Sequence, residues 1–114
     1  MKKLLLYPSI LLLMYSPALA TMSGDQIKSE LVGKNLAWSQ GKYSGTATYE
    51  PNGSARLTMK GSKIKSDIGK WAIKGNKLCI TWKKVRNGKQ LCTTVNKTGN
   101  NSYKYSSGAL VTRR

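Results

Sequence analysis

The sequence contains no histidine and no phenylalanine, and only 4 of its 114 residues are Asp or Glu. Without histidine, Ser-His and Cys-His nucleophile pairs cannot form, and two cysteines are too few for the usual zinc sites. The acids are scattered along the chain, unlike a general acid and base placed together: Asp25, Glu30, Glu50 and Asp67. We therefore predict a binding or interaction protein with no catalytic residues, no metal and no cofactor.

Long apolar runs are absent except at the N-terminus, where Lys2 and Lys3 precede an apolar stretch at residues 4–14. Residues 18–20, Ala-Leu-Ala, then supply the small-x-small pattern at which secretory signal peptides are cleaved. The stretch is shorter than the roughly 20 residues of a membrane-spanning helix. We predict that residues 1–20 are a cleaved signal peptide, that no transmembrane segment remains after cleavage, and that the protein is secreted or periplasmic.

Cysteine is also scarce, and the two that exist are Cys79 and Cys92. Export would place both in an oxidising compartment, where an even pair in a small domain most simply forms one disulfide. Closing a loop of this length stabilises the folded state by roughly 2–3 kcal/mol in the chain-entropy account. A pair of free reactive thiols is the alternative.

The remaining sequence has the pattern of an all-β domain that begins with a short helix. Ser23 and Gln26 match a capping box, and Gly33 stands where a helix C′ glycine is expected, which predicts a helix over residues 24–32. From Asn35 onward, apolar and polar residues alternate between Gly and Asn turns. We predict a single domain over residues 21–114, a small antiparallel barrel or sandwich of about eight short strands.

Strand alternation also predicts which side chains form the core. Trp71 and Trp82 fall on the apolar phase of their strands and are expected to be buried, whereas the other aromatic residues are less committed. A turn at residues 50–53 is expected to join the first clear hairpin. The segments expected to be extended are residues 43–49, 55–60, 63–65, 70–74, 78–83, 91–95, 103–105 and 109–111.

The hairpin that carries the cysteines allows two registers. A two-residue loop at Asn87 and Gly88 would place Cys79 and Cys92 four residues out of register, on the order of 13 Å apart. A disulfide spans roughly 4.4–6.8 Å between Cα atoms, so this hairpin and the disulfide exclude each other. Direct pairing of the cysteines leaves a four-residue loop over residues 84–87. We favour direct pairing because export supports the disulfide.

Positive charge is the property that the sequence has in excess, with 20 Lys and Arg residues and a net charge of +16. Residues 68–114 contain 11 basic side chains and no acidic one, whereas residues 21–67 contain 7 basic side chains and all 4 acids. We predict that the later half presents an outward anion-binding patch, with a general solubilising coat of lysine as the alternative. The patch would consist of Lys70, Lys74, Lys83, Lys84, Arg86, Lys89, Lys97 and Lys104.

Several short motifs lie in the middle of the chain. They are a Tyr-x-x-x-Gly hairpin at residues 49–53, Gly-x-Trp at 69–71, Leu-Cys-x-x-Trp at 78–82, and Cys92. Over roughly residues 31–96 the sequence resembles a family of small exported alphaproteobacterial β-domains of unknown function. The resemblance implies a periplasmic or secreted β-domain and brings no catalytic residues. The high lysine content departs from what the family leads us to expect.

Two functional hypotheses follow. The first is a secreted or periplasmic basic protein that binds an anionic surface or polymer, such as an envelope lipid, a polysaccharide or an acidic protein surface. Nucleic acid would be attracted by the same electrostatics, although export argues against it as the physiological ligand. The second is a secreted effector or proteinaceous inhibitor of an extracellular enzyme, acting through a loop at residues 50–53 or 84–88.

Overall fold

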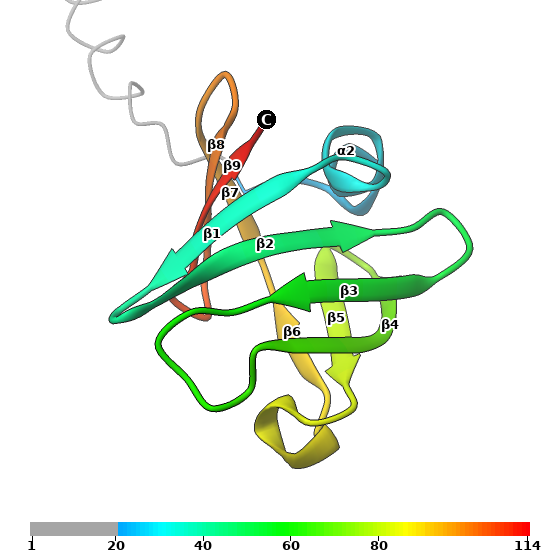
Figure 1. The fold of residues 1–114 in the computed structure, drawn as a ribbon. Helices are drawn as coiled ribbons and strands as arrows, with labels where there is room; N and C mark the ends of the chain where they lie inside the picture. The colour runs from blue at the N-terminus through cyan, green and yellow to red at the C-terminus, as the bar shows by residue number, and fades with distance from the viewer. Residues whose placement is uncertain (1–20) are drawn as a thin grey trace, which may run out of the picture.

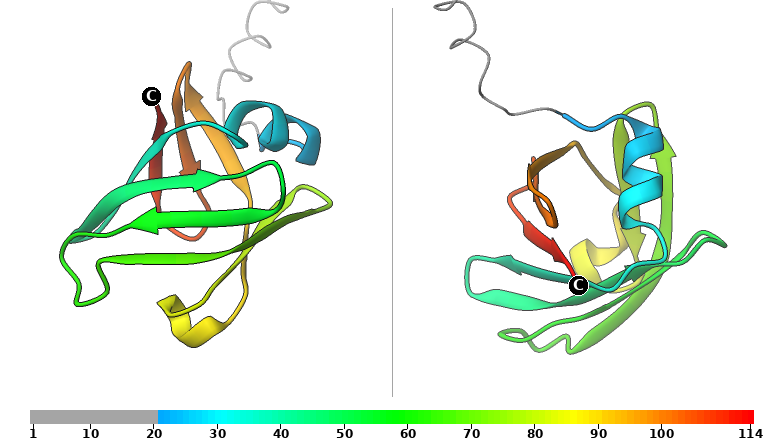
Figure 2. Two further views of the ribbon diagram at one scale, coloured as in Figure 1. Left: turned by 45° about the vertical axis from the view of Figure 1, so that its right-hand side comes forward. Right: turned by 90° about the horizontal axis from the view of Figure 1, so that it is seen from above.

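The computed structural model describes residues 21–114, so the predicted signal peptide at residues 1–20 lies outside the described residues. Nine antiparallel strands form one sheet that curls into a nearly closed barrel, and helix α2 (Gly24–Leu31) lies against one end (Figures 1 and 2). This is the predicted barrel. The strands are β1 (Leu36–Gln40), β2 (Tyr43–Tyr49), β3 (Ser54–Thr58), β4 (Ser66–Lys74), β5 (Lys77–Trp82), β6 (Leu91–Thr93), β7 (Val95–Gly99), β8 (Ser102–Tyr105) and β9 (Leu110–Arg113).

Strands β6 and β7 close the barrel. They occupy the two ends of the strand order β6-β5-β4-β3-β2-β1-β9-β8-β7, and only Thr94 separates them in the chain. Ser106 holds this bend, because its hydroxyl accepts a hydrogen bond from the Thr94 N–H (3.0 Å) and its own N–H donates to the Thr94 carbonyl (2.9 Å). The two edges of the sheet are thus parts of one bent segment, which removes the long exposed edges of an open sheet.

Helix α2 covers one end of the barrel and confirms the helix prediction to within one residue. The Ser23 hydroxyl accepts from the Gln26 N–H (3.2 Å), and the Gln26 side chain accepts from the Ser23 N–H (2.9 Å). Ile27 and Leu31 are completely buried, and they give this short helix the tertiary packing that it needs to be stable. Within residues 21–114, no helix has the length and apolar character needed to cross a membrane.

The structure contains the disulfide in the register that we favoured. Cys79 and Cys92 are bonded and lie directly opposite each other in β5 and β6. The four-residue loop is wrong, because β5 ends at Trp82 and β6 begins at Leu91. The longer loop contains the 3-10 turn η1 (Val85–Gly88), in which Arg86 and Asn87 have positive φ angles and turn the chain left-handedly.

Several other strand predictions need correction. The strand β1 is not among the predicted segments, and the predicted segment 91–95 is divided at Thr94 between β6 and β7. Residues 63–65 form a loop, in which the Met59 N–H bonds to the Lys65 carbonyl (2.8 Å), and the following strand begins earlier, at Ser66. The last strand is Leu110–Arg113 rather than 109–111. Ala109 belongs to the preceding turn, where its carbonyl accepts from the Tyr105 N–H (2.9 Å).

The core lies where alternation predicted it, between the inward faces of the strands and α2. Trp82 is buried as expected. Trp71 is only partly buried at the helix-covered end, where it packs against the core and its indole N–H donates to the Glu50 carbonyl (2.7 Å).

Candidate ligand-binding cavity and its basic rim

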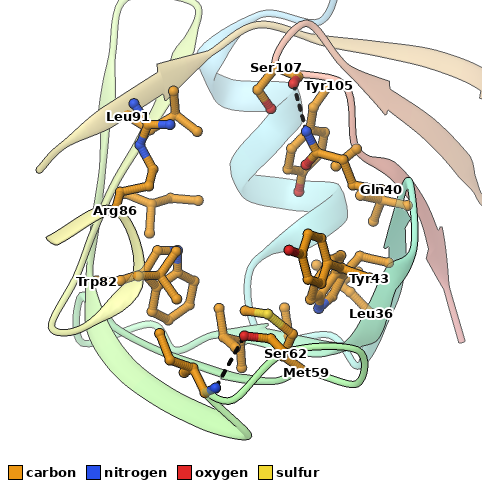
Figure 3. Close-up of a pocket in the computed structure, with 18 of the residues that line it drawn as sticks. Leu36, Gln40, Tyr43, Met59, Ser62, Trp82, Arg86, Leu91, Tyr105 and Ser107 are labelled. Atoms are coloured by element: carbon orange, nitrogen blue, oxygen red, sulfur yellow. Dashed lines mark hydrogen bonds between the residues drawn. The ribbon is translucent and has the colours of Figure 1, made fainter. Parts of the chain in front are cut away.

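The barrel is hollow at the end opposite α2. A cavity of about 530 Å³ opens there, and Figure 3 looks into it with α2 behind. Its volume and its mainly apolar and aromatic wall match those of small-molecule sites in proteins. The apolar and aromatic side chains of the wall include Leu36, Trp38, Ala47, Leu57, Met59, Ile80, Trp82, Leu91, Tyr105 and Val111.

A pair of hydrogen-bonded tyrosines lines the cavity. Tyr49 in β2 and Tyr105 in β8 are both buried, and their hydroxyl oxygens are 3.1 Å apart. Burial raises the pKa of Tyr49 to about 12, although its hydrogen bond with Tyr105 lowers it, and burial raises the pKa of Tyr105 well above the usual value. Both stay protonated at neutral pH. Their mutual bond uses one hydroxyl hydrogen, so the pair has a second one to donate to a ligand oxygen.

The cavity wall contains two more polar side chains, and they differ in whether they form a hydrogen bond within the protein. The Gln40 amide donates to the Ser107 carbonyl (3.0 Å) and links β1 to the β8–β9 turn across one side of the mouth (Figure 3). The indole N–H of Trp82 has no hydrogen-bond partner within residues 21–114, although this side chain is only 9% exposed. Buried indole N–H groups usually find a partner, so Trp82 offers a second free donor to a ligand.

Basic side chains lie on three of the four connections at the mouth of the cavity. Because the strands run alternately up and down, the β1–β2, β3–β4, β5–β6 and β8–β9 connections all lie at this open end. The first three of these carry exposed cations, none of which forms a salt bridge within residues 21–114. We call this set the basic rim: Lys42, Lys60, Lys63, Lys65, Lys83, Lys84, Arg86 and Lys89.

The rim has no exposed carboxylate to offset it. Asp67, near the open end of β4, is 5% exposed, and its carboxylate accepts hydrogen bonds from the N–H groups of Ile68 (2.9 Å), Lys84 (2.8 Å) and Val85 (2.9 Å). Burial alone would raise the pKa of Asp67, but the N–H donors of Val85, Lys84 and Ile68 outweigh it and hold the pKa below its usual value. Asp67 therefore anchors the β5–β6 loop.

The remaining acids lie at the helix-covered end. Asp25 and Glu30 belong to α2, and Glu50 follows β2 at the same end and pairs with Arg56. Glu30 accepts from the Tyr103 hydroxyl (2.8 Å) and pairs with Lys97 (3.0 Å), and the Tyr103 bond is the main cause of its lowered pKa. The helix-covered end therefore carries acids beside its own cations, whereas the basic rim carries cations alone.

The eight residues of the predicted anion-binding patch do not lie together. Four of them gather in the β5–β6 loop and belong to the basic rim: Lys83, Lys84, Arg86 and Lys89. Lys70 and Lys74 lie on the outer face of β4, and Lys104 lies on the outer face of β8. Lys97 lies opposite the buried Tyr103 in the sheet and forms a salt bridge with Glu30 at the helix-covered end.

Sequence reasoning missed the half of the rim that comes from the first part of the chain. Lys42, Lys60, Lys63 and Lys65 lie in a segment whose net charge is low, because it also contains all the acids. The sequence feature that could have revealed them is the order of the turns, because in a meander of antiparallel strands every second turn lies at the same end. Assigning charges to turns rather than to halves of the chain would have found them.

In the part of the chain that the structure describes, no three side chains of His, Cys, Asp or Glu come together as a metal site requires. The resemblance to the exported alphaproteobacterial family stays a prediction. No protein-family model matches the chain, and comparisons with curated proteins and with solved structures find nothing similar to it.

Proposed function

We propose that the protein is a secreted or periplasmic binding protein for a small amphipathic anion. The apolar part of the ligand would occupy the cavity, and its anionic group would lie among the cations of the basic rim. The observation that carries this proposal is an apolar cavity whose open end carries basic side chains on three of its four connections and no exposed acid. The sequence alone predicts an anionic partner, and the cavity restricts this prediction to anions that also have an apolar part.

The cavity volume limits the size of the ligand. A cavity of roughly 150 Å³ accommodates benzene, so about 25 Å³ serves each non-hydrogen atom. At 530 Å³ the cavity has room for about 20 such atoms. A single alkyl chain with a carboxylate, sulfate or phosphate group fits this limit, whereas a two-chain phospholipid does not fit as a whole.

Dodecanoate is a suitable first probe, with dodecanol as its uncharged match. Trp38 and Trp82 line the cavity, so binding should change the intrinsic fluorescence of the protein. We expect saturable binding of dodecanoate, weaker binding of dodecanol, and loss of the difference at high salt, because salt screens the exposed rim. Equal affinity for both probes at low salt would contradict a role for the rim.

A cavity-filling variant tests where the probe binds. Ala47 lines the cavity, whereas Ala72 is exposed on the outer face of β4. Ala47→Phe should abolish saturable binding, and Ala72→Phe should leave it unchanged. Circular dichroism and thermal unfolding establish that both variants are folded. Undiminished binding by a folded Ala47→Phe protein would overturn the proposed site.

The second candidate function is a secreted effector or inhibitor that acts through a loop. The observation that favours it is the anchoring of Lys84 and Val85 by Asp67, which preorganises the β5–β6 loop. A pull-down that recovers one stoichiometric protein at moderate salt would support this candidate. Recovery that disappears at the same salt as heparin binding would count against it.

A further inference from the structure

The basic rim fits a second partner, the surface of an anionic bilayer. We infer that the protein docks on anionic membranes with its open end toward the lipid, so that a ligand can pass between bilayer and cavity without crossing water. This inference rests on the proposed function, because it gives the open cavity a source for its ligand.

Charge complementarity supports this orientation. Each basic side chain close to an anionic membrane surface strengthens binding by about fivefold, and the effect disappears within a Debye length. The basic rim has eight exposed cations and no exposed acid, whereas the helix-covered end has Asp25, Glu30 and Glu50 beside its own cations. Docking with the helix-covered end would bring those carboxylates toward the lipid headgroups.

Apolar side chains at the mouth favour a bilayer over a soluble polyanion. Tyr43 is 38% exposed, and Ile64 and Val85 are partly exposed among the rim cations. All three line the opening of the cavity, and Tyr43 is visible at the mouth in Figure 3. Surfaces that combine basic and apolar side chains bind the boundary between headgroups and acyl chains, whereas a polysaccharide or nucleic acid backbone would use only the charges.

Vesicle sedimentation can test which end of the barrel faces the membrane. It compares two variants that each lose three positive charges, at opposite ends. In Lys83→Gln/Lys84→Gln/Lys89→Gln the rim loses three cations, and in Lys28→Gln/Lys34→Gln/Lys77→Gln the helix-covered end loses three. We expect the wild type to bind phosphatidylcholine vesicles that contain phosphatidylglycerol, and not phosphatidylcholine alone. The rim variant should bind on the order of 100-fold more weakly. The matched control should bind like the wild type, and equal loss in both variants would overturn the inference.

A second pair of measurements separates bilayer docking from general polyanion binding. Tyr43→Ser/Ile64→Ser removes apolar side chains from the mouth and leaves every charge in place. We expect weaker binding to the anionic vesicles and unchanged retention on heparin. Strong heparin binding together with no vesicle binding by the wild type would overturn the inference.

The cavity variant distinguishes failure of docking from failure of the proposed function. Ala47→Phe fills the cavity without changing the rim, so it should lose dodecanoate binding and still sediment with anionic vesicles. Dodecanoate binding by the wild type without vesicle binding would overturn docking alone. Vesicle binding without any dodecanoate binding would overturn the proposed function and leave the docking surface supported.

Discussion

At the scale of single residues, Arg86 has an unfavourable backbone conformation. Its φ angle is 60°, a left-handed conformation that costs most residues about 1–2 kcal/mol. Arg86 also lines the mouth of the cavity, as a member of the basic rim. Strained residues cluster at functional sites, where neighbouring structure holds them. The hydrogen bonds from Lys84 and Val85 to Asp67 supply that support here.

Arg86→Gly should therefore stabilise the fold and weaken the site. We expect the free energy of unfolding to rise by up to about 1 kcal/mol, since relief of strain exceeds the added freedom of glycine in the unfolded chain. Dodecanoate affinity should fall by up to about fivefold through loss of one exposed ion pair. Urea unfolding and fluorescence titration measure the two effects. Lys84, which has a right-handed conformation, supplies the control, because Lys84→Gly should lower stability.

Asp67 should make the protein sensitive to acid. Its pKa is lowered by folding, so its contribution is present above the unfolded pKa of about 3.9 and is lost as pH falls through the lower folded value. Asp67→Asn removes this titration, and the variant should lose less stability than the wild type between neutral pH and about pH 3. Urea midpoints measured across that range provide the test. Parallel curves for the two proteins would show that Asp67 contributes nothing to the acid response.

At the scale of elements, the β5–β6 hairpin joins the disulfide, the strained loop and half of the basic rim. Direct pairing of Cys79 with Cys92 aligns the two strands, and the long loop between them reaches the mouth of the cavity. The far end of the barrel depends on a different element, α2, which buries Ile27 and Leu31. The covered end has the packing of α2 to stabilise it, whereas the loop at the open end is held by Asp67.

Removal of the disulfide should destabilise the protein without moving the cavity. Cys79→Ser/Cys92→Ser is expected to lower the free energy of unfolding by roughly 2–3 kcal/mol, because the unfolded chain regains the freedom of the closed loop. Equilibrium denaturation of the variant and of the oxidised wild type measures this difference. Dodecanoate affinity should change little under conditions where the variant is folded. A large loss of affinity in the folded variant would show that the disulfide positions the β5–β6 loop.

At the scale of the whole molecule, the two ends of the barrel differ in how they are filled. One end is covered by α2 and carries both acids and cations, and the other is hollow and carries the basic rim without an exposed acid. Exposed surface lysines contribute little to stability as ion pairs. In the proposed function, their concentration around an apolar opening attracts the anion to a cavity where its apolar group can be buried.

The length of the ligand should determine affinity up to the size of the cavity. In a series of alkyl carboxylates from octanoate upward, each added methylene should tighten binding about fourfold, because burying it contributes about 0.8 kcal/mol. The gain should stop near about 20 non-hydrogen atoms, where the cavity is full. Fluorescence titration of the series provides the measurement. Affinity that does not change with chain length would contradict burial of the alkyl group.

Much of the architecture could be predicted because it depends on local pattern. The capping box at Ser23 and Gln26, the inward position of Trp82 and the pairing of Cys79 with Cys92 all follow from short-range spacing and covalent geometry. The shape of the β5–β6 loop could not be predicted in this way. It depends on Asp67, which lies 17 residues before Lys84 in the chain. A contact of that range leaves no periodicity in the sequence.

The sequence by itself determined that this is a basic β-domain with one disulfide and no histidine-based chemistry, since composition and alternation act through local physics. Only the tertiary structure decided where the charge lies. The two halves of the chain differ in net charge. In the barrel, however, turns from both halves lie at the same end. The rim therefore joins Lys42 and Lys63 to Lys83 and Arg86 around a cavity. No segment of the sequence contains that cavity, because its wall comes from strands along the whole barrel.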